Sequence, residues 1–338
     1  MSKNRIDHVH AAAPLHVSRA GSRPASARSD RSGSLTFSDA AERYLANREL
    51  LGLKHGTLSD YESYLRVHLL PTFGPMPLDE ISPDDIDAFI ALKRREGKAT
   101  KSVLNYLGLM SAILGHGMKR GWCATNVVAA IDKPLDRRTT EIRYLNKQEL
   151  EALLAAVPPT ERGQVERVLY LTAAMTGLRR GELLALRWQD VDPNAGVIRV
   201  RRTYTRGHFG APKTRRSSRA VPLAARVRHD LERHRGRRRW NQDQDLVFAH
   251  PNTGRVLEPS RLRKRFQAAA RRAGLRPVRF HDLRHTFGTR MAAAGEPLRA
   301  VQEWLGHSDY RTTSIYADYA PDATQGALWA ARAFDEAA

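Results

Sequence analysis

Apolar side chains recur at spacings of three and four residues in four successive segments between residues 35 and 130, which predicts four amphipathic helices. Capping residues and helix breakers mark their ends: Ser82 followed by Pro83 opens the third helix, and Pro71 is expected to stop the second. Short helices of this kind favour a compact bundle, residues 35–130, as the first domain. The helices are expected to begin at Thr36 or Ser38, at Thr57, at Ser82 and at Thr100, and the last two to end near Gly97 and Arg120.

A second domain, residues 144–320, combines helical periodicity with one β-rich interval. A capping-box-like start at Asn146 opens its first helix. Residues 197–204 alternate between apolar and polar side chains, which predicts a strand that pairs with a second strand at 218–223. The predicted fold class is therefore mainly α with a small antiparallel β-sheet, in two domains. The other helices are expected near residues 164–176, 223–235, 260–273, 282–294 and 298–305, with a short piece around residue 316.

Three further segments lie outside these domains. Residues 1–34 are rich in Ser, Ala, Arg and Gly, which predicts a disordered basic tail; a DNA-contacting arm is the alternative. Residues 131–143 are polar, include Pro134 and lack periodicity, so we interpret them as an interdomain linker. Residues 321–338 carry apolar side chains at helical spacing and predict a tail helix.

The chain is strongly basic, with 56 Lys and Arg against 36 Asp and Glu and a net charge of +20. A charge of this size favours a polyanionic partner, of which nucleic acid is the commonest. Cys123 is the single cysteine, which excludes a disulfide framework and a Cys-based zinc site. No signal-peptide pattern and no apolar stretch of membrane-spanning length occurs, so we expect a cytoplasmic protein without a membrane partner.

Residues 280–319 concentrate side chains that suit phosphate chemistry. The run HDLRH opens a predicted helix, so its first His and its Arg share one face. A guanidinium matches two phosphate oxygens, and a phenol becomes a competent nucleophile where cations stabilise the phenolate. With an Arg and a Lys from upstream, the set is suited to hold a phosphodiester and to attack it with a phenol. The set comprises Arg179, Lys213, His281, Arg284, His307 and Tyr316.

The two upstream cations also have plainer interpretations. Arg179 could be a surface residue paired with Glu182, and Arg180 beside it is the competing candidate for a phosphate contact. Lys213 lies in a basic run near the turn between the predicted strands, where most lysines are solvated or contact DNA backbone. A lysine whose pKa is lowered among cations can instead protonate a leaving group. Composition and spacing do not separate these alternatives.

The downstream residues leave alternatives open as well. Tyr316 could be an ordinary packing tyrosine, and Tyr319 is the competing nucleophile. His281 and His285 have the i, i+4 spacing of some zinc ligands, but an HExxH pattern, a third ligand and a cysteine are missing. We therefore expect no metal at this site.

Taken in order, these motifs resemble the tyrosine recombinase family, the phage-integrase-like site-specific DNA recombinases. The family's ordered set of Arg, Lys, His-x-x-Arg, His or Trp, and Tyr is matched at every position, over residues 145–320. Glu182 takes the position of the family's acidic residue that supports the first Arg, and residues 35–130 look like its helical core-binding domain. Arg215, Arg216 and Arg219, from the basic run around the lysine, are expected to contact DNA.

The resemblance implies a transesterification that needs no metal, ATP or other cofactor. Tyr316 would attack the scissile phosphate and form a 3′-phosphotyrosyl bond. Arg179, Arg284 and His307 would stabilise the developing charge, and the phenol proton would be managed by His281. Lys213 would protonate the 5′-oxygen.

Partners follow from the same resemblance: double-stranded DNA recombination sites and a homo-tetramer in the synaptic complex. The tail helix at 321–338 would then dock on a neighbouring protomer, with packing on its own domain as the alternative. Whether a directionality factor takes part is left open. The rival functions are DNA relaxation of the type IB topoisomerase kind and DNA binding without cleavage.

Overall fold

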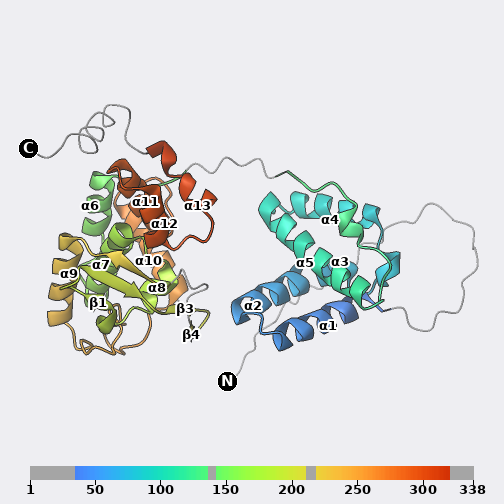
Figure 1. The fold of residues 1–338 in the computed structure, drawn as a ribbon, viewed down its shortest axis with the longest axis horizontal. Coiled ribbons are helices and arrows are strands. Elements are labelled where there is room, and N and C mark those ends of the chain that lie inside the picture. Colours follow the sequence, from blue (N-terminus) through green and yellow to red (C-terminus); the bar gives the residue numbers. More distant parts are fainter. Residues whose placement is uncertain (1–34, 136–141, 211–217, 320–338) are drawn as a thin grey trace, which may run out of the picture. The chain divides into compact units, whose positions relative to one another are not determined.

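The computed structural model describes residues 35–135, 142–210 and 218–319, which belong to two compact units that divide after residue 136 (Figure 1). The predicted tails at 1–34 and 321–338, and with them Lys213, Arg215 and Arg216, lie outside the described residues. The fold is mainly helical with small antiparallel sheets, as predicted. In the described ranges no helix is both long and apolar enough to cross a membrane.

The first unit is a helical bundle whose helix starts are set by local capping. Thr36 caps the first helix through a reciprocal pair of hydrogen bonds with Asp39, and Ser82 does the same with Asp85 before Pro83. Both caps were predicted from the sequence. The elements are α1 (Phe37–Leu50), α2 (His55–Tyr64), a π-helical segment (Leu65–Leu69), α3 (Leu70–Phe73), α4 (Pro83–Arg95) and α5 (Thr100–Lys119), with single 3₁₀ turns at Leu78–Glu80 and Val127–Ala129.

Pro71 does not stop the second helix, contrary to the prediction. The helical path continues to Phe73 because the chain widens into the π-helical turn just before the proline, where Leu70 donates to the Leu65 carbonyl five residues back. Proline lacks an N–H and would leave a gap in a regular α-helical ladder. The wider turn absorbs that gap, and the helix ends instead at Gly74.

Apolar and aromatic side chains fill the interior of this unit. Phe73 packs its ring against Phe37 and Phe89, with centroid distances of 6.0 and 5.3 Å. The long helix α5 supplies the largest share of the core, with Met110 and Ile113 fully buried. These contacts explain why helices that would be marginal alone form a stable bundle.

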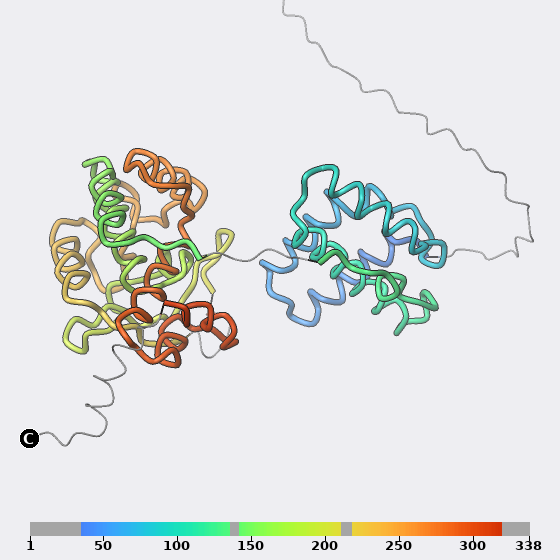
Figure 2. The backbone as a smooth tube through the Cα atoms, turned by 90° about the horizontal axis from the view of Figure 1, so that it is seen from above, coloured from blue at the N-terminus to red at the C-terminus, as the bar shows by residue number. Residues whose placement is uncertain are grey.

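The second unit begins with the capping box predicted at Asn146, which exchanges hydrogen bonds with Glu149. Most of its helices lie within a few residues of the predicted bounds, and the backbone path can be followed in Figure 2. Helix α7 is buried on nearly all sides and packs along α11, so these two helices form the centre of the unit. The helices are α6 (Lys147–Ala155), α7 (Glu161–Thr176), α8 (Arg180–Leu184), α9 (Ala225–Gly236), α10 (Pro259–Arg272), α11 (Asp282–Ala293), α12 (Leu298–Leu305) and α13 (Arg311–Ser314), with 3₁₀ turns at Trp188–Asp190 and Ala317–Tyr319.

A three-stranded antiparallel sheet lies beside these helices in the order β1 (Val191–Asp192), β2 (Val197–Val200) and β5 (Arg219–Pro222). The predicted pairing is confirmed: Ile198 faces Val221, and both are fully buried. The first predicted strand is wrong in one respect, because it does not continue to Tyr204.

Strand β2 ends at Val200 because the next part of the chain turns toward the buried carboxylate of Asp190. Arg202 forms an ion pair with Asp190, whose exposed fraction is 1%. The chain then pairs with itself as a separate hairpin of β3 (Thr203–Thr205) and β4 (His208–Gly210). The turn residues Arg206 and Gly207 both have positive φ, at 51° and 88°, as two-residue hairpin turns require.

Candidate active site

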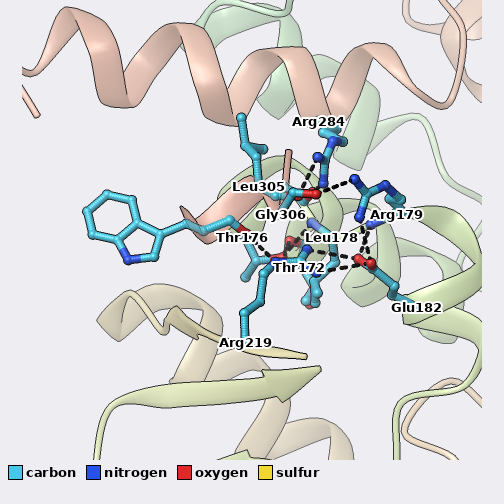
Figure 3. Close-up of polar contacts among 11 residues, drawn as sticks. Thr172, Thr176, Leu178, Arg179, Glu182, Arg219, Arg284, Leu305 and Gly306 are labelled. Atoms are coloured by element: carbon cyan, nitrogen blue, oxygen red, sulfur yellow. Dashed lines mark hydrogen bonds and ion pairs between the residues drawn. The ribbon is translucent and has the colours of Figure 1, made fainter. Parts of the chain in front are cut away.

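The site is built around the loop that joins α7 to α8. Helix α7 ends at Gly177 in the left-handed conformation, and two residues later Arg179 takes the N-cap position of α8. The Arg179 guanidinium donates to Glu182 Oε1 at 2.9 Å and to the Gly306 carbonyl at 2.8 Å (Figure 3). Its side chain keeps 38% of its area exposed, so this guanidinium is held in place and still open to a ligand.

Glu182 supports Arg179, as expected, but it also holds a second cation. Arg219, at the start of β5, places Nη1 and Nη2 on the two carboxylate oxygens of Glu182 at 3.0 and 2.9 Å (Figure 3). Burial alone would raise the pKa of Glu182, but the hydrogen bonds and charges of Arg219 and Arg179 outweigh it and lower that pKa. The carboxylate therefore stays ionised between two guanidiniums.

Arg219, which the sequence predicts as a DNA contact, is largely buried in this unit. Only 6% of its side chain is exposed, and its Nε donates to the carbonyl of Trp304 while both terminal nitrogens face Glu182. These hydrogen bonds hold the Arg219 guanidinium against Glu182. The β-pairing of Arg219 with Val200 brings it next to Glu182, and the sequence contains no local sign of that.

Arg284 lies on the first turn of α11 and is 2% exposed. It donates to the carbonyls of Gly177 and Leu305, which ties α11 to the ends of α7 and α12 (Figure 3). Burial and the charge of Arg179 lower the pKa of Arg284 to about 9, which still leaves the guanidinium charged at neutral pH. The site thus gathers three arginines around one carboxylate.

His307 lies in the turn after α12, and its orientation is set by a buried hydroxyl. Its Nδ1 lies 2.9 Å from Thr313 Oγ1, and the Thr313 side chain is fully buried. Burial and the charges of Arg284, Arg179 and Arg219 lower the pKa of His307 to about 3. The ring is therefore neutral at physiological pH, and with Nδ1 occupied its Nε2 is left to meet a ligand.

Tyr316 follows α13 and is 1% exposed. Its hydroxyl lies 2.9 Å from Nδ1 of His285, one turn after His281 on α11. Burial raises the pKa of Tyr316 to about 12, opposed by the charge of Arg284. Tyr319, the competing tyrosine, packs edge-on against Tyr144 at 5.3 Å instead.

Sequence reasoning missed His285 in this role and considered it only as a zinc ligand. The i, i+4 spacing that suggested zinc also places His285 on the helix face that receives Tyr316, but nothing local in the sequence says that the tyrosine returns there. Within the described ranges, no three His, Cys, Asp or Glu side chains are grouped so that they could hold a metal ion. Of the six predicted catalytic positions, five are described and lie in this one unit; Lys213 is outside the described residues.

Comparisons with known proteins identify the family of this chain. Residues 143–322 match the phage integrase family, and residues 36–94 match the phage integrase N-terminal SAM-like domain. A XerC-like tyrosine recombinase from Caldanaerobacter subterraneus subsp. tengcongensis is 26% identical over 319 residues, covering 85% of this chain and 80% of that protein.

Solved structures show the same fold. The Tn1549 transposon integrase in complex with a circular intermediate DNA superposes with a TM-score of 0.71 at 22% identity, over 89% of this chain and 99% of that one. A lambda integrase tetramer bound to a Holliday junction gives a TM-score of 0.64 at 22% identity, over 82% and 78% of the two chains. The family match spans more than half of the sequence and includes the unit that holds the Arg, His and Tyr cluster, so this chain belongs to the phage integrase family and is an enzyme of the tyrosine recombinase class.

Proposed function

We propose that this chain is a site-specific DNA recombinase that cuts and rejoins DNA through a 3′-phosphotyrosyl intermediate, in the integration or excision of a mobile element. One observation carries the proposal: Arg179, Arg284, His307 and Tyr316 converge on one site. The charges of both arginines act on the His307 ring, and the charge of Arg284 acts on Tyr316. A phenol, a neutral imidazole and an accessible guanidinium in one site are groups that can attack a phosphodiester and stabilise the charge that develops on it.

Each residue takes a role in the proposed reaction. Arg179 and Arg284 share the charge that develops on the phosphate oxygens, and His307 donates a hydrogen bond through Nε2. The Tyr316 oxygen attacks phosphorus, and the bond to the 5′-oxygen breaks. Lys213 protonates that oxygen, and His281 helps to manage the phenol proton. The phosphotyrosyl bond retains the energy of the broken bond, so no nucleotide cofactor takes part.

The two units divide the remaining work in this proposal. Residues 144–320 form the catalytic domain, and residues 35–130 the core-binding domain that contacts DNA. The Tn1549 integrase structure contains DNA, and the lambda integrase structure is a tetramer on a Holliday junction, which supports double-stranded recombination sites as the partner and a homo-tetramer as the working assembly. Arg215 and Arg216 contact DNA backbone, and residues 321–338 form the protomer contact.

The test is formation of a covalent protein–DNA adduct on a nicked recombination site, seen on a denaturing gel. Wild type is expected to form the adduct, with or without EDTA, and Tyr316→Phe is expected to bind DNA equally well and form none. Tyr319→Phe is the matched control and should keep the adduct. An adduct that persists in Tyr316→Phe and vanishes in Tyr319→Phe would reject the assignment of the nucleophile.

Recombination and relaxation are separated on plasmid substrates. A plasmid with two copies of the site should be resolved into two circles or inverted between them. Relaxation of supercoils at any sequence, without exchange between sites, would instead show topoisomerase activity. If wild type forms no adduct on its own site, the alternative function, DNA binding without cleavage, is favoured instead.

A further inference from the structure

The hydroxyl of Tyr316 has a partner that the recombinase motif does not include. Its oxygen lies 2.9 Å from Nδ1 of His285, and the two ring centroids are 6.0 Å apart. His281, the histidine of the motif, precedes His285 by one turn and meets its ring edge-on at 5.0 Å. His281 is exposed at the N-cap of α11, whereas His285 lies deeper, at the phenol itself.

Helix α11 is shaped to receive the phenol at this position. Gly288 follows His285 by three residues on the same face, and a Cβ there would lie 2.5 Å from Cζ of Tyr316. No other residue type fits without moving the ring. Gly288 therefore leaves space on the helix for the Tyr316 ring, and His285 Nδ1 lies at the Tyr316 hydroxyl. The two contacts together fix the position of the phenol oxygen.

Burial and nearby charges act on the pKa of the His285 ring. Burial lowers the pKa of His285. The charges of Arg279, just before the helix, and of Arg284, on the same helix, lower this pKa further, whereas the charge of Asp282 raises it. His281 and Tyr316 are titratable neighbours of His285 as well. A neutral imidazole that carries its proton on Nε2 presents a lone pair at Nδ1, which is the atom that faces the phenol.

We propose that His285 is a catalytic residue of the cleavage step: it hydrogen-bonds the Tyr316 hydroxyl through Nδ1 and accepts its proton as the oxygen attacks phosphorus. This rests on the recombinase function proposed above. The Tyr316 O–P bond forms as the P–O5′ bond breaks, the phenol proton moves to His285 Nδ1, and the 5′-oxygen takes its proton from Lys213. His281 acts on the proton through His285. A bound phosphodiester adds a negative charge beside the rings, which offsets the arginines and makes the imidazole a stronger base.

The first test compares His285→Asn with His281→Asn in single-turnover cleavage of the nicked site by the full chain. Asn keeps a polar group near Nδ1 and cannot take a proton, so His285→Asn is expected to slow cleavage about 100-fold, within the range of general-base catalysis, at unchanged DNA affinity. Wild-type cleavage should rise with pH as His285 loses its proton. That rise should vanish in His285→Asn and persist in His281→Asn.

A substrate with sulfur in place of the bridging 5′-oxygen separates the two proton transfers, because a thiolate leaves without protonation. The defect of Lys213→Ala should be recovered on this substrate, and the defect of His285→Asn should remain. Incorporation of a more acidic fluorinated tyrosine at position 316 should reduce the defect of His285→Asn, since such a phenol needs a base less.

Cleavage by His285→Asn within threefold of wild type, with the same rise with pH, would overturn the inference. Absence of an adduct in wild type would instead overturn the proposed function. If His285→Asn fails to fold, ¹⁵N NMR of the histidine rings in wild type decides: Nδ1 of His285 must be unprotonated at neutral pH. A proton on Nδ1 would mean that His285 donates to the phenol oxygen, and the inference would fail.

Discussion

The two units of this chain bury very different side chains. Among the described residues, the first unit buries one charged side chain, Lys93, and its amine reaches the more exposed Glu96 at 2.9 Å. The described part of the second unit buries twelve polar or charged side chains, and Glu182, Arg284 and Thr313 are among them. The first unit is held together by apolar and aromatic packing. The second unit, by contrast, buries ionised groups in its candidate active site.

Such burial is tolerated only where every charge has a partner. In the second unit one carboxylate, Glu182, serves Arg179 and Arg219, and backbone carbonyls serve Arg284. The guanidiniums are therefore oriented before any DNA arrives, and their reorganisation costs little in the reaction. The contrast predicts that the two units respond differently to the same kinds of change.

Glu182→Gln is expected to have the largest effect. It leaves the guanidiniums of Arg179 and Arg219 without their counter-charge and should destabilise the second unit by about 4 kcal/mol, the range for breaking a buried ion pair. Hydrogen exchange of the full chain, resolved by peptide, reads each unit separately. Glu151→Gln is the control, because its pair with Arg226 is exposed at 44% and 40% of the side-chain areas and should cost less than about 1 kcal/mol. Equal losses in the two variants would contradict the buried network.

Ile113→Ala tests the apolar unit. Ile113 is fully buried in α5, and its truncation should destabilise the first unit by about 3 kcal/mol through lost burial and a cavity. Exchange in the second unit should not change. Leu51→Ala, at a position 66% exposed, should alter neither unit. A parallel loss of protection in the second unit would show that the two unfold together.

Acid should weaken the second unit through buried histidines. Burial lowers the pKa of His234 to about 4, so as pH falls below about 6.5 the unfolded chain takes up a proton that the folded chain refuses. Stability is lost between about pH 6.5 and 4, and His234 should account for about 2 kcal/mol of the loss at pH 5. His234→Gln keeps a donor to the Val247 carbonyl and should remove that share. An unchanged pH dependence in His234→Gln would reject this explanation.

Thr313→Val should have the smallest effect and acts on the site alone. The hydroxyl orients His307, and the Thr313 carbonyl accepts from the Tyr316 amide, so the residue connects the phosphate contact to the nucleophile. Loss of one hydrogen bond of about 1 kcal/mol should slow cleavage about fivefold at unchanged DNA affinity. Thr312→Val, at the exposed neighbouring position, should cleave as wild type does. If the two variants cleave alike, His307 is oriented by other groups.

Features that depend on neighbours in the chain were predictable. The capping residues Thr36, Ser82 and Asn146 begin their helices as expected, because a cap is satisfied by an amide three residues away. The prediction that Pro71 stops the second helix was wrong, because a π-helical turn before the proline lets the helix continue to Phe73. The strand from residue 197 was predicted too long, because the ion pair of Arg202 with Asp190 forms only in the folded unit.

The sequence by itself determined the two-domain organisation, the mainly helical fold class and the ordered set of Arg, Lys, His and Tyr that identifies the family, because periodicity, capping and motif spacing are local properties. Only the tertiary structure decided which side chains meet. It placed the Arg219 guanidinium on the Glu182 carboxylate, and it placed the Tyr316 hydroxyl beside Nδ1 of His285. Both contacts join residues more than thirty positions apart, and such pairings depend on how β5, α8 and α11 pack together.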